Sequence, residues 1–155
     1  MPPRLPASAI LLGIAGLLPL LSCAAAAILL PDPKGATYLA ALIDYAAVIL
    51  AFLGAVHWGF ALTAVPPRLV GARLSLGVLP ALIGWIALLL QGAVGPMPAI
   101  ALLTGGFTAT VLTEQRLRRH GLVASGYMWL RWALSSVVLS VLGIVMMVKI
   151  FGIRV

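Results

Sequence analysis

Few side chains in this sequence can take part in acid–base chemistry, because the 155 residues include only three acidic residues and two histidines. Asp44 and His57 both lie in one long apolar run, where an ionisable side chain indicates a proton or ion pathway through a membrane. They are 13 positions apart, which is roughly 20 Å along a helix, and they point to different sides. A direct Asp–His pair is therefore excluded. The candidate partners of Asp44 are Lys149, Lys34, Tyr38 and Gln91.

Each of these two residues also has a structural interpretation. Asp44 can form a structural hydrogen bond, or be a neutral, protonated acid close to the membrane interface. His57 can be a proton carrier, a haem ligand or a quinone contact, or a buried histidine bonded to a backbone carbonyl or hydroxyl. Haem with two histidine ligands would need a second intramembrane histidine, and His120 lies in a polar loop. No cofactor is therefore predicted.

A polar cluster of His57, Glu114 and Arg131 is predicted at the membrane level of His57. Glu114 ends one apolar segment and Arg131 begins the next, near the level of His57. An Arg131–Glu114 pair would offset the cost of holding either charge at the membrane edge. Alternatively, Arg131 extends to lipid phosphates, and Trp129 and Trp132 form an interfacial belt.

No recognised catalytic or metal-binding motif accompanies these residues. The two histidines and the single cysteine are scattered, and the sequence contains no phosphate-binding loop or nucleophile triad. We therefore expect no catalytic, metal-binding or cofactor-binding residues, and no enzyme.

The composition identifies the environment of these residues. The chain is 63% hydrophobic and 8% charged, with a mean hydropathy of +1.20, whereas soluble chains are roughly a quarter charged. A soluble enzyme, a disordered tail and a secreted disulfide scaffold are excluded. The net charge of +7 does not indicate nucleic-acid binding, because Arg and Lys stand singly or in short groups between apolar runs. The partner predicted by composition is the lipid bilayer.

Five segments are long and apolar enough to cross a bilayer, which needs about 20 residues each. They predict an all-α, polytopic bundle of five transmembrane helices that forms a single integral membrane domain, residues 1–155. The expected spans are residues 7–30, 37–64, 74–91, 97–114 and 127–150.

The distribution of Arg and Lys between loops predicts the orientation. One side of the membrane carries seven and the other carries three, which places the N-terminus in the cytoplasm, the C-terminus outside, and the protein in a bacterial inner membrane. The first set is Arg4, Arg68, Arg73, Arg116, Arg118, Arg119 and Arg131, and the second is Lys34, Lys149 and Arg154.

The first segment also has an alternative interpretation. Leu20-Leu21-Ser22-Cys23 after an apolar run is typical of a lipoprotein signal with an acylated cysteine. The apolar run continues to Leu30, and this length favours a retained span in which Cys23 is a small packed residue.

Small residues recur every four positions on the second segment, at Ala47, Ala51, Ala55 and Gly59. Such a stripe predicts a close helix contact in lipid. Asp44 lies on nearly the same angular line and is therefore expected to face the bundle interior. The fourth segment carries a small, hydroxylated stretch, which is either a packing face or a pore lining. Its residues are Thr104, Gly105, Gly106, Thr108, Thr110 and Thr113.

The first and third segments share a local pattern. Residues 16–21 (Gly-Leu-Leu-Pro-Leu-Leu) are similar to residues 77–82 (Gly-Val-Leu-Pro-Ala-Leu). The similarity indicates either a parallel internal repeat of the kind found in transporters or two helices kinked at proline.

Three motifs carry a resemblance to a known family. The first runs from Tyr45 to Gly59 and ends in His57-Trp58-Gly59; the others are Leu79-Pro80-Ala81-Leu82-x-Gly84-Trp85 and Tyr127-x-x-Leu130-Arg131. Together they resemble the transmembrane protein 69 family of small multi-pass proteins in bacteria and mitochondria, although Gly126 stands where the family often has an aromatic residue. The resemblance implies an inner-membrane protein with about five helices. It implies no reaction.

Two functions remain open. The first is a non-enzymatic accessory or assembly factor that packs against a larger membrane complex, which the small size and short loops favour. The second is a small transporter or channel that uses Asp44 and His57 within a homo-oligomer.

Overall fold

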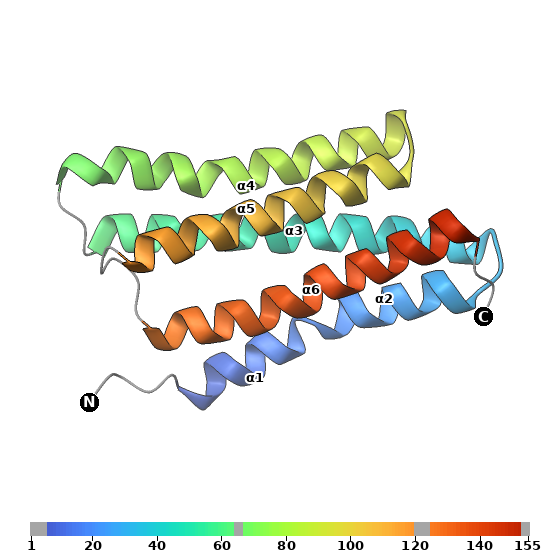
Figure 1. Cartoon of the computed structure of the whole chain (residues 1–155), viewed down its shortest axis with the longest axis horizontal. Helices are drawn as coiled ribbons and strands as arrows, with labels where there is room; N and C mark the ends of the chain where they lie inside the picture. The colour runs from blue at the N-terminus through green and yellow to red at the C-terminus, as the bar shows by residue number, and fades with distance from the viewer. Residues whose placement is uncertain (1–5, 64–66, 120–124, 153–155) are drawn as a thin grey trace. The chain divides into compact units, whose positions relative to one another are not determined.

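The structure is a computed structural model that describes residues 6–63, 67–119 and 125–152. All regular structure within these residues is helical (Figure 1), which confirms the predicted all-α class. The helices are α1 (Ala7–Ala15), α2 (Leu18–Leu29), α3 (Lys34–Thr63), α4 (Pro67–Ala93), α5 (Pro96–Arg119) and α6 (Ser125–Phe151).

Five helical stretches of the described chain have the length and apolar composition needed to cross a membrane, as predicted. The first consists of α1 and α2 together, and each of the others lies within one longer helix. The stretches are Ala7–Leu29, Lys34–Gly59, Arg73–Ala93, Pro96–Leu117 and Met128–Phe151.

Proline and glycine mark the helix boundaries. α2, α4 and α5 each have a proline in their first two positions, where its missing N–H is not needed. Between α4 and α5, Gly95 has a φ of +122°, which glycine adopts at little cost. At the start of α3, the backbone N–H of Ala36 donates to Asp32 Oδ1 over 3.1 Å. This bond satisfies one of the N–H groups that a helix start leaves without a partner.

The two similar Gly-x-Leu-Pro segments adopt different structures. Pro19 follows a break, because α1 ends at Ala15 and α2 begins at Leu18. Pro80 instead lies inside α4, which continues through it. The predicted internal repeat is not tested by this difference and stays a prediction.

The chain divides into two compact units, residues 1–42 with 111–155 and residues 43–110. In the first unit, α6 packs against α2 and α1 (Figure 1). Gly13 of α1 allows a close approach, because a Cβ there would lie 3.0 Å from Leu134 Cδ1 of α6. The single membrane domain expected over residues 1–155 stays a prediction.

In the second unit, α3 packs closely against α4 and α5. A Cβ on Gly84 would lie 3.0 Å from the carbonyl oxygen of Ala47, and one on Gly106 would lie 2.8 Å from Leu50 and Ile83. A Cβ on Gly54 would overlap the backbone of Gly77. These small residues let the helix backbones approach, as is common for helices in lipid.

The face of α3 that is buried differs from the predicted stripe. Ala47 is buried and Ala51 is half-buried, but Ala55 and Gly59 are exposed. The prediction of one continuous four-residue stripe is therefore wrong. Positions four apart drift by about 40° at each step around a helix with 3.6 residues per turn. The buried face keeps its direction by alternating steps of four and three: Ile43, Ala47, Leu50, Gly54, His57 and Ala61.

Candidate functional site

An ion pair joins α5 and α6 in the first unit. Arg131 Nε donates to Glu114 Oε2 over 2.6 Å, and the two side chains are only 3% and 1% exposed. Both residues lie inside candidate membrane spans. The predicted Arg131–Glu114 pair is confirmed. The alternative, in which Arg131 extends to lipid phosphates, is wrong because the guanidinium is buried.

Ser135 completes this site and was not predicted. Its buried Oγ accepts a hydrogen bond from Arg131 Nη1 over 3.1 Å. Residues four apart share a helix face, so the spacing of Arg131 and Ser135 on α6 was the available signal. Beside the pair, Trp132 is exposed and its Nε1 donates to Gln115 Oε1 over 3.4 Å. This bond is a second polar link between α5 and α6.

The chemical consequence of this arrangement is structural. A single buried charge in a membrane span is costly, and the cost falls when an opposite charge and further hydrogen bonds satisfy it. The bond from Arg131 to Glu114 sets which turn of α6 faces which turn of α5, and the bond to Ser135, on the same helix, orients the guanidinium. The site holds the two helices in register.

A second polar pair lies in the other unit. Gln91 Nε2 of α4 donates to Asp44 Oδ1 of α3 over 3.2 Å, which confirms Gln91 as one of the predicted partners. The expectation that Asp44 faces the bundle interior is wrong, because its side chain is exposed. Asp44 lies beside the face of α3 that packs against α4 and α5, close enough to accept the bond from Gln91 of α4.

His57 is buried, with 2% of its surface exposed, and lies on the packing face of α3. Arg73, at the start of the third span, is buried to the same extent. Both belong to the unit of residues 43–110, whereas Glu114 and Arg131 belong to the other unit. The full cluster of His57, Glu114 and Arg131 therefore stays a prediction.

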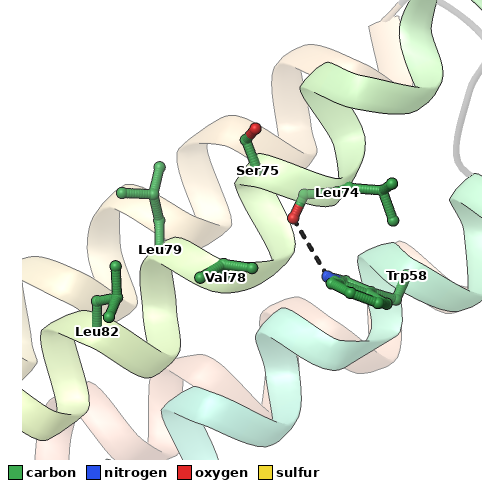
Figure 2. A pocket seen from close by; sticks show the side chains of 6 residues that line it. All are labelled: Trp58, Leu74, Ser75, Val78, Leu79 and Leu82. Atoms are coloured by element: carbon green, nitrogen blue, oxygen red, sulfur yellow. Dashed lines mark hydrogen bonds between the residues drawn. The ribbon is translucent and has the colours of Figure 1, made fainter.

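Trp58 lines one side of an open groove between α3 and α4 in the second unit. Its indole Nε1 donates to the backbone carbonyl of Leu74 over 3.2 Å (Figure 2). The groove has a volume of about 420 Å³. Its lining residues are Trp58, Leu74, Ser75, Val78, Leu79 and Leu82.

Three threonines of α5 satisfy their hydroxyls within their own helix. Thr104, Thr108 and Thr110 each donate to the carbonyl four residues earlier, over 2.8 Å. Gly106, between them, is buried against neighbouring side chains. This local bonding favours the packing interpretation of the stretch over a pore lining. Among the described residues, no three His, Cys, Asp or Glu side chains lie close enough together to hold a metal ion.

The comparisons with known proteins agree with the resemblance of the three motifs. Residues 5–147 match the model of a family described as a protein of unknown function (DUF3429). The chain is 40% identical over 90 residues to Transmembrane protein 69 of Xenopus tropicalis. That match covers 56% of this chain and 34% of the relative, so the chain spans about a third of the relative's length. No solved structure matches the chain.

Proposed function

This chain belongs to the DUF3429 family of proteins of unknown function, and we propose that it is a non-enzymatic accessory or assembly factor that docks on a larger membrane complex. Five candidate spans occupy most of its length, so most of the described surface belongs to these spans. The observation that carries the proposal is the exposed position of Asp44 on that surface.

Asp44 lies within the candidate span Lys34–Gly59, and its side chain is exposed. Its single hydrogen bond with the described residues comes from the neutral amide of Gln91. A carboxylate that faces lipid is costly, and intramembrane acids usually pair with a donor or a cation. The chemistry that fits is a membrane helix of another protein that carries an arginine or lysine at this depth.

The surroundings of Asp44 suit such a helix contact. Val48 and Phe52, one and two turns further along α3, are 62% and 69% exposed. Ala55 follows on the same face and is also exposed. The face combines apolar side chains, a small residue and one acid, which supplies both close packing and a charge for selectivity.

Site-specific photocrosslinking in native membranes tests the docking face. A benzophenone amino acid at Val48 is expected to capture one membrane protein, and the crosslinked peptide should contain an Arg or Lys within an apolar span. Asp44→Lys should abolish the product by placing like charges together. Val94→Lys, which introduces the same charge at an exposed residue outside the candidate spans, is the matched control and should leave the product in place. A product that persists in Asp44→Lys, or that contains only two copies of this chain, would contradict the proposal.

The proposed location is a bacterial inner membrane, with the N-terminus in the cytoplasm. The asymmetry of seven cationic residues against three supports this orientation. Reporter enzymes fused after residue 155 test it: a phosphatase that works only outside the cytoplasm should be active, and a fluorescent protein that matures only in the cytoplasm should be dark.

A small transporter is the second candidate function, favoured by the interruption of the first span between Ala15 and Leu18. Discontinuous helices commonly line transport sites. Proton flux into liposomes that contain the purified chain tests this candidate. Flux above that of empty liposomes, lowered in both Asp44→Asn and His57→Ala, would support it, and equal flux in all samples would exclude proton transport.

A further inference from the structure

An exposed cation lies at the end of the fourth candidate span. Arg116 is next to the last residue of Pro96–Leu117, and its side chain is exposed. Among the described residues, nothing forms a hydrogen bond or an ion pair with its guanidinium. The charge of Arg116 is therefore available to a group outside the chain, at the depth where the span meets the lipid headgroups.

The acids of the chain do not compensate this charge. Glu114, two positions earlier on α5, is almost completely buried and bonds to Arg131. Two positions correspond to a turn of about 200° around a helix, so Glu114 points inward while Arg116 points outward. The other two acids of the sequence, Asp32 and Asp44, accept hydrogen bonds from uncharged groups elsewhere. The ligand that complements Arg116 must bring a negative charge.

Gln115 adds a second donor beside this cation. Its Oε1 accepts the hydrogen bond from Trp132 Nε1 over 3.4 Å, which turns the oxygen side of the amide toward α6. The amide nitrogen has no acceptor within the part of the chain that the structure describes. Gln115 and Arg116 thus both offer N–H groups, and a phosphate oxygen accepts such bonds most strongly from a charged donor.

Apolar and aromatic side chains flank the two donors. Leu112 lies one turn before Arg116 on the same face of α5 and is 51% exposed. The indole of Trp132, which Gln115 holds beside α5, is 44% exposed. Tryptophan is enriched where lipid headgroups meet hydrocarbon. The surface combines hydrocarbon contacts with a cation at the level of a lipid phosphate.

We propose that Arg116 and Gln115 bind the phosphate of an anionic phospholipid, whose acyl chain lies against Leu112 and Trp132. A zwitterionic lipid fits less well, because its own ammonium group competes with Arg116 for the phosphate. A cationic residue near the membrane surface favours anionic lipid by roughly fivefold. The site is separate from the docking face around Asp44 and does not depend on it.

Quenching of Trp132 fluorescence tests the site directly. The full chain carries four tryptophans, so Trp58→Phe, Trp85→Phe and Trp129→Phe leave Trp132 as the sole emitter. This variant is placed in phosphatidylcholine vesicles that contain equal mole fractions of brominated phosphatidylglycerol or brominated phosphatidylcholine. The anionic lipid should be enriched at Trp132 by about fivefold, as read from the quenching.

Variants of Arg116 identify the group that selects the lipid. Arg116→Gln should lower the preference for brominated phosphatidylglycerol by about fivefold, and Arg116→Lys, which keeps the charge, should retain it. Arg116→Ala provides the same comparison if Arg116→Gln does not purify as a monodisperse protein. Lys34→Gln removes one exposed cation at the start of α3 and is the matched control that should leave the preference in place. Equal quenching by the two lipids, a preference unchanged without the Arg116 charge, or an equal loss in Lys34→Gln would overturn the proposal.

Discussion

Two polar pairs within the candidate spans differ in burial and in charge. Arg131 and Glu114 carry full, opposite charges, and both side chains are almost completely buried. Asp44 carries the only acidic group of its pair, its partner Gln91 is a neutral amide, and its side chain is exposed. Each pair joins two neighbouring helices within candidate spans.

This difference indicates that the first pair stabilises the fold and that the second is accessible to a partner. A buried charge must be matched inside the chain, because nothing from outside reaches it. An exposed acid in lipid that has only a neutral amide partner keeps acceptor capacity for a group outside the chain. We therefore expect changes at the first pair to alter the folding of the chain, and changes at the second to alter association.

The largest effect is expected for Glu114→Ala. The change leaves the guanidinium of Arg131 buried without its carboxylate, which costs about 3–5 kcal/mol. The free energy of unfolding, measured in detergent micelles by dodecyl sulfate titration, should fall by that amount. Gln115→Ala, at the next residue, removes only the 3.4 Å bond from Trp132, and should cost about 1 kcal/mol or less.

A double variant tests whether the charge itself is responsible. Replacing both Glu114 and Arg131 with Met removes both charges and keeps much of the volume. It should recover most of the stability lost in Glu114→Ala, since apolar replacements of buried ion pairs are often close to neutral. A double variant as unstable as Glu114→Ala would mean that packing, and not charge matching, holds α5 and α6 together.

Much of this arrangement could be predicted from the sequence. The five spans follow from apolar length, because the bilayer thickness sets how many residues must be apolar. The Arg131–Glu114 pair also follows, since opposite charges at the facing ends of consecutive helices are expected to meet. In both cases one physical constraint, the bilayer thickness or the pairing of opposite charges, outweighs the details of side-chain packing.

The direction of each face on α3 could not be predicted in the same way. This helix is apolar on all sides, so hydropathy does not distinguish its packing face from its lipid face. Positions four apart drift around the helix axis. The predicted stripe therefore included the exposed residues Ala55 and Gly59, and Asp44 was wrongly expected to face the interior. Contacts such as Ala47 with Gly84 and Gly54 with Gly77 decide the orientation, and they join positions far apart in the sequence.

A smaller loss of stability is expected for Ser135→Ala, beside the buried pair. Ser135→Ala removes the acceptor of Arg131 Nη1, and hydrogen bonds to charged groups contribute about 1.5–3 kcal/mol. The free energy of unfolding should fall by this amount, less than for Glu114→Ala because the carboxylate remains. The control is Ser136→Ala, at an exposed serine whose hydroxyl donates to the carbonyl of Trp132 within the same helix. Equal losses in the two serine variants would contradict a role for Ser135 in the site.

The smallest effect on folding is expected for Asp44→Asn. Asparagine keeps an oxygen that can accept from Gln91 Nε2, and substitutions at exposed positions usually change stability by less than about 0.5 kcal/mol. The unfolding titration of the isolated chain should therefore be nearly unchanged, while the crosslink from Val48 to its partner weakens. The reverse pattern, a chain destabilised as strongly as Ser135→Ala with an intact crosslink, would place Asp44 among the structural groups. The contrast between an inward pair that stabilises the fold and an outward acid that recognises a partner would then be lost.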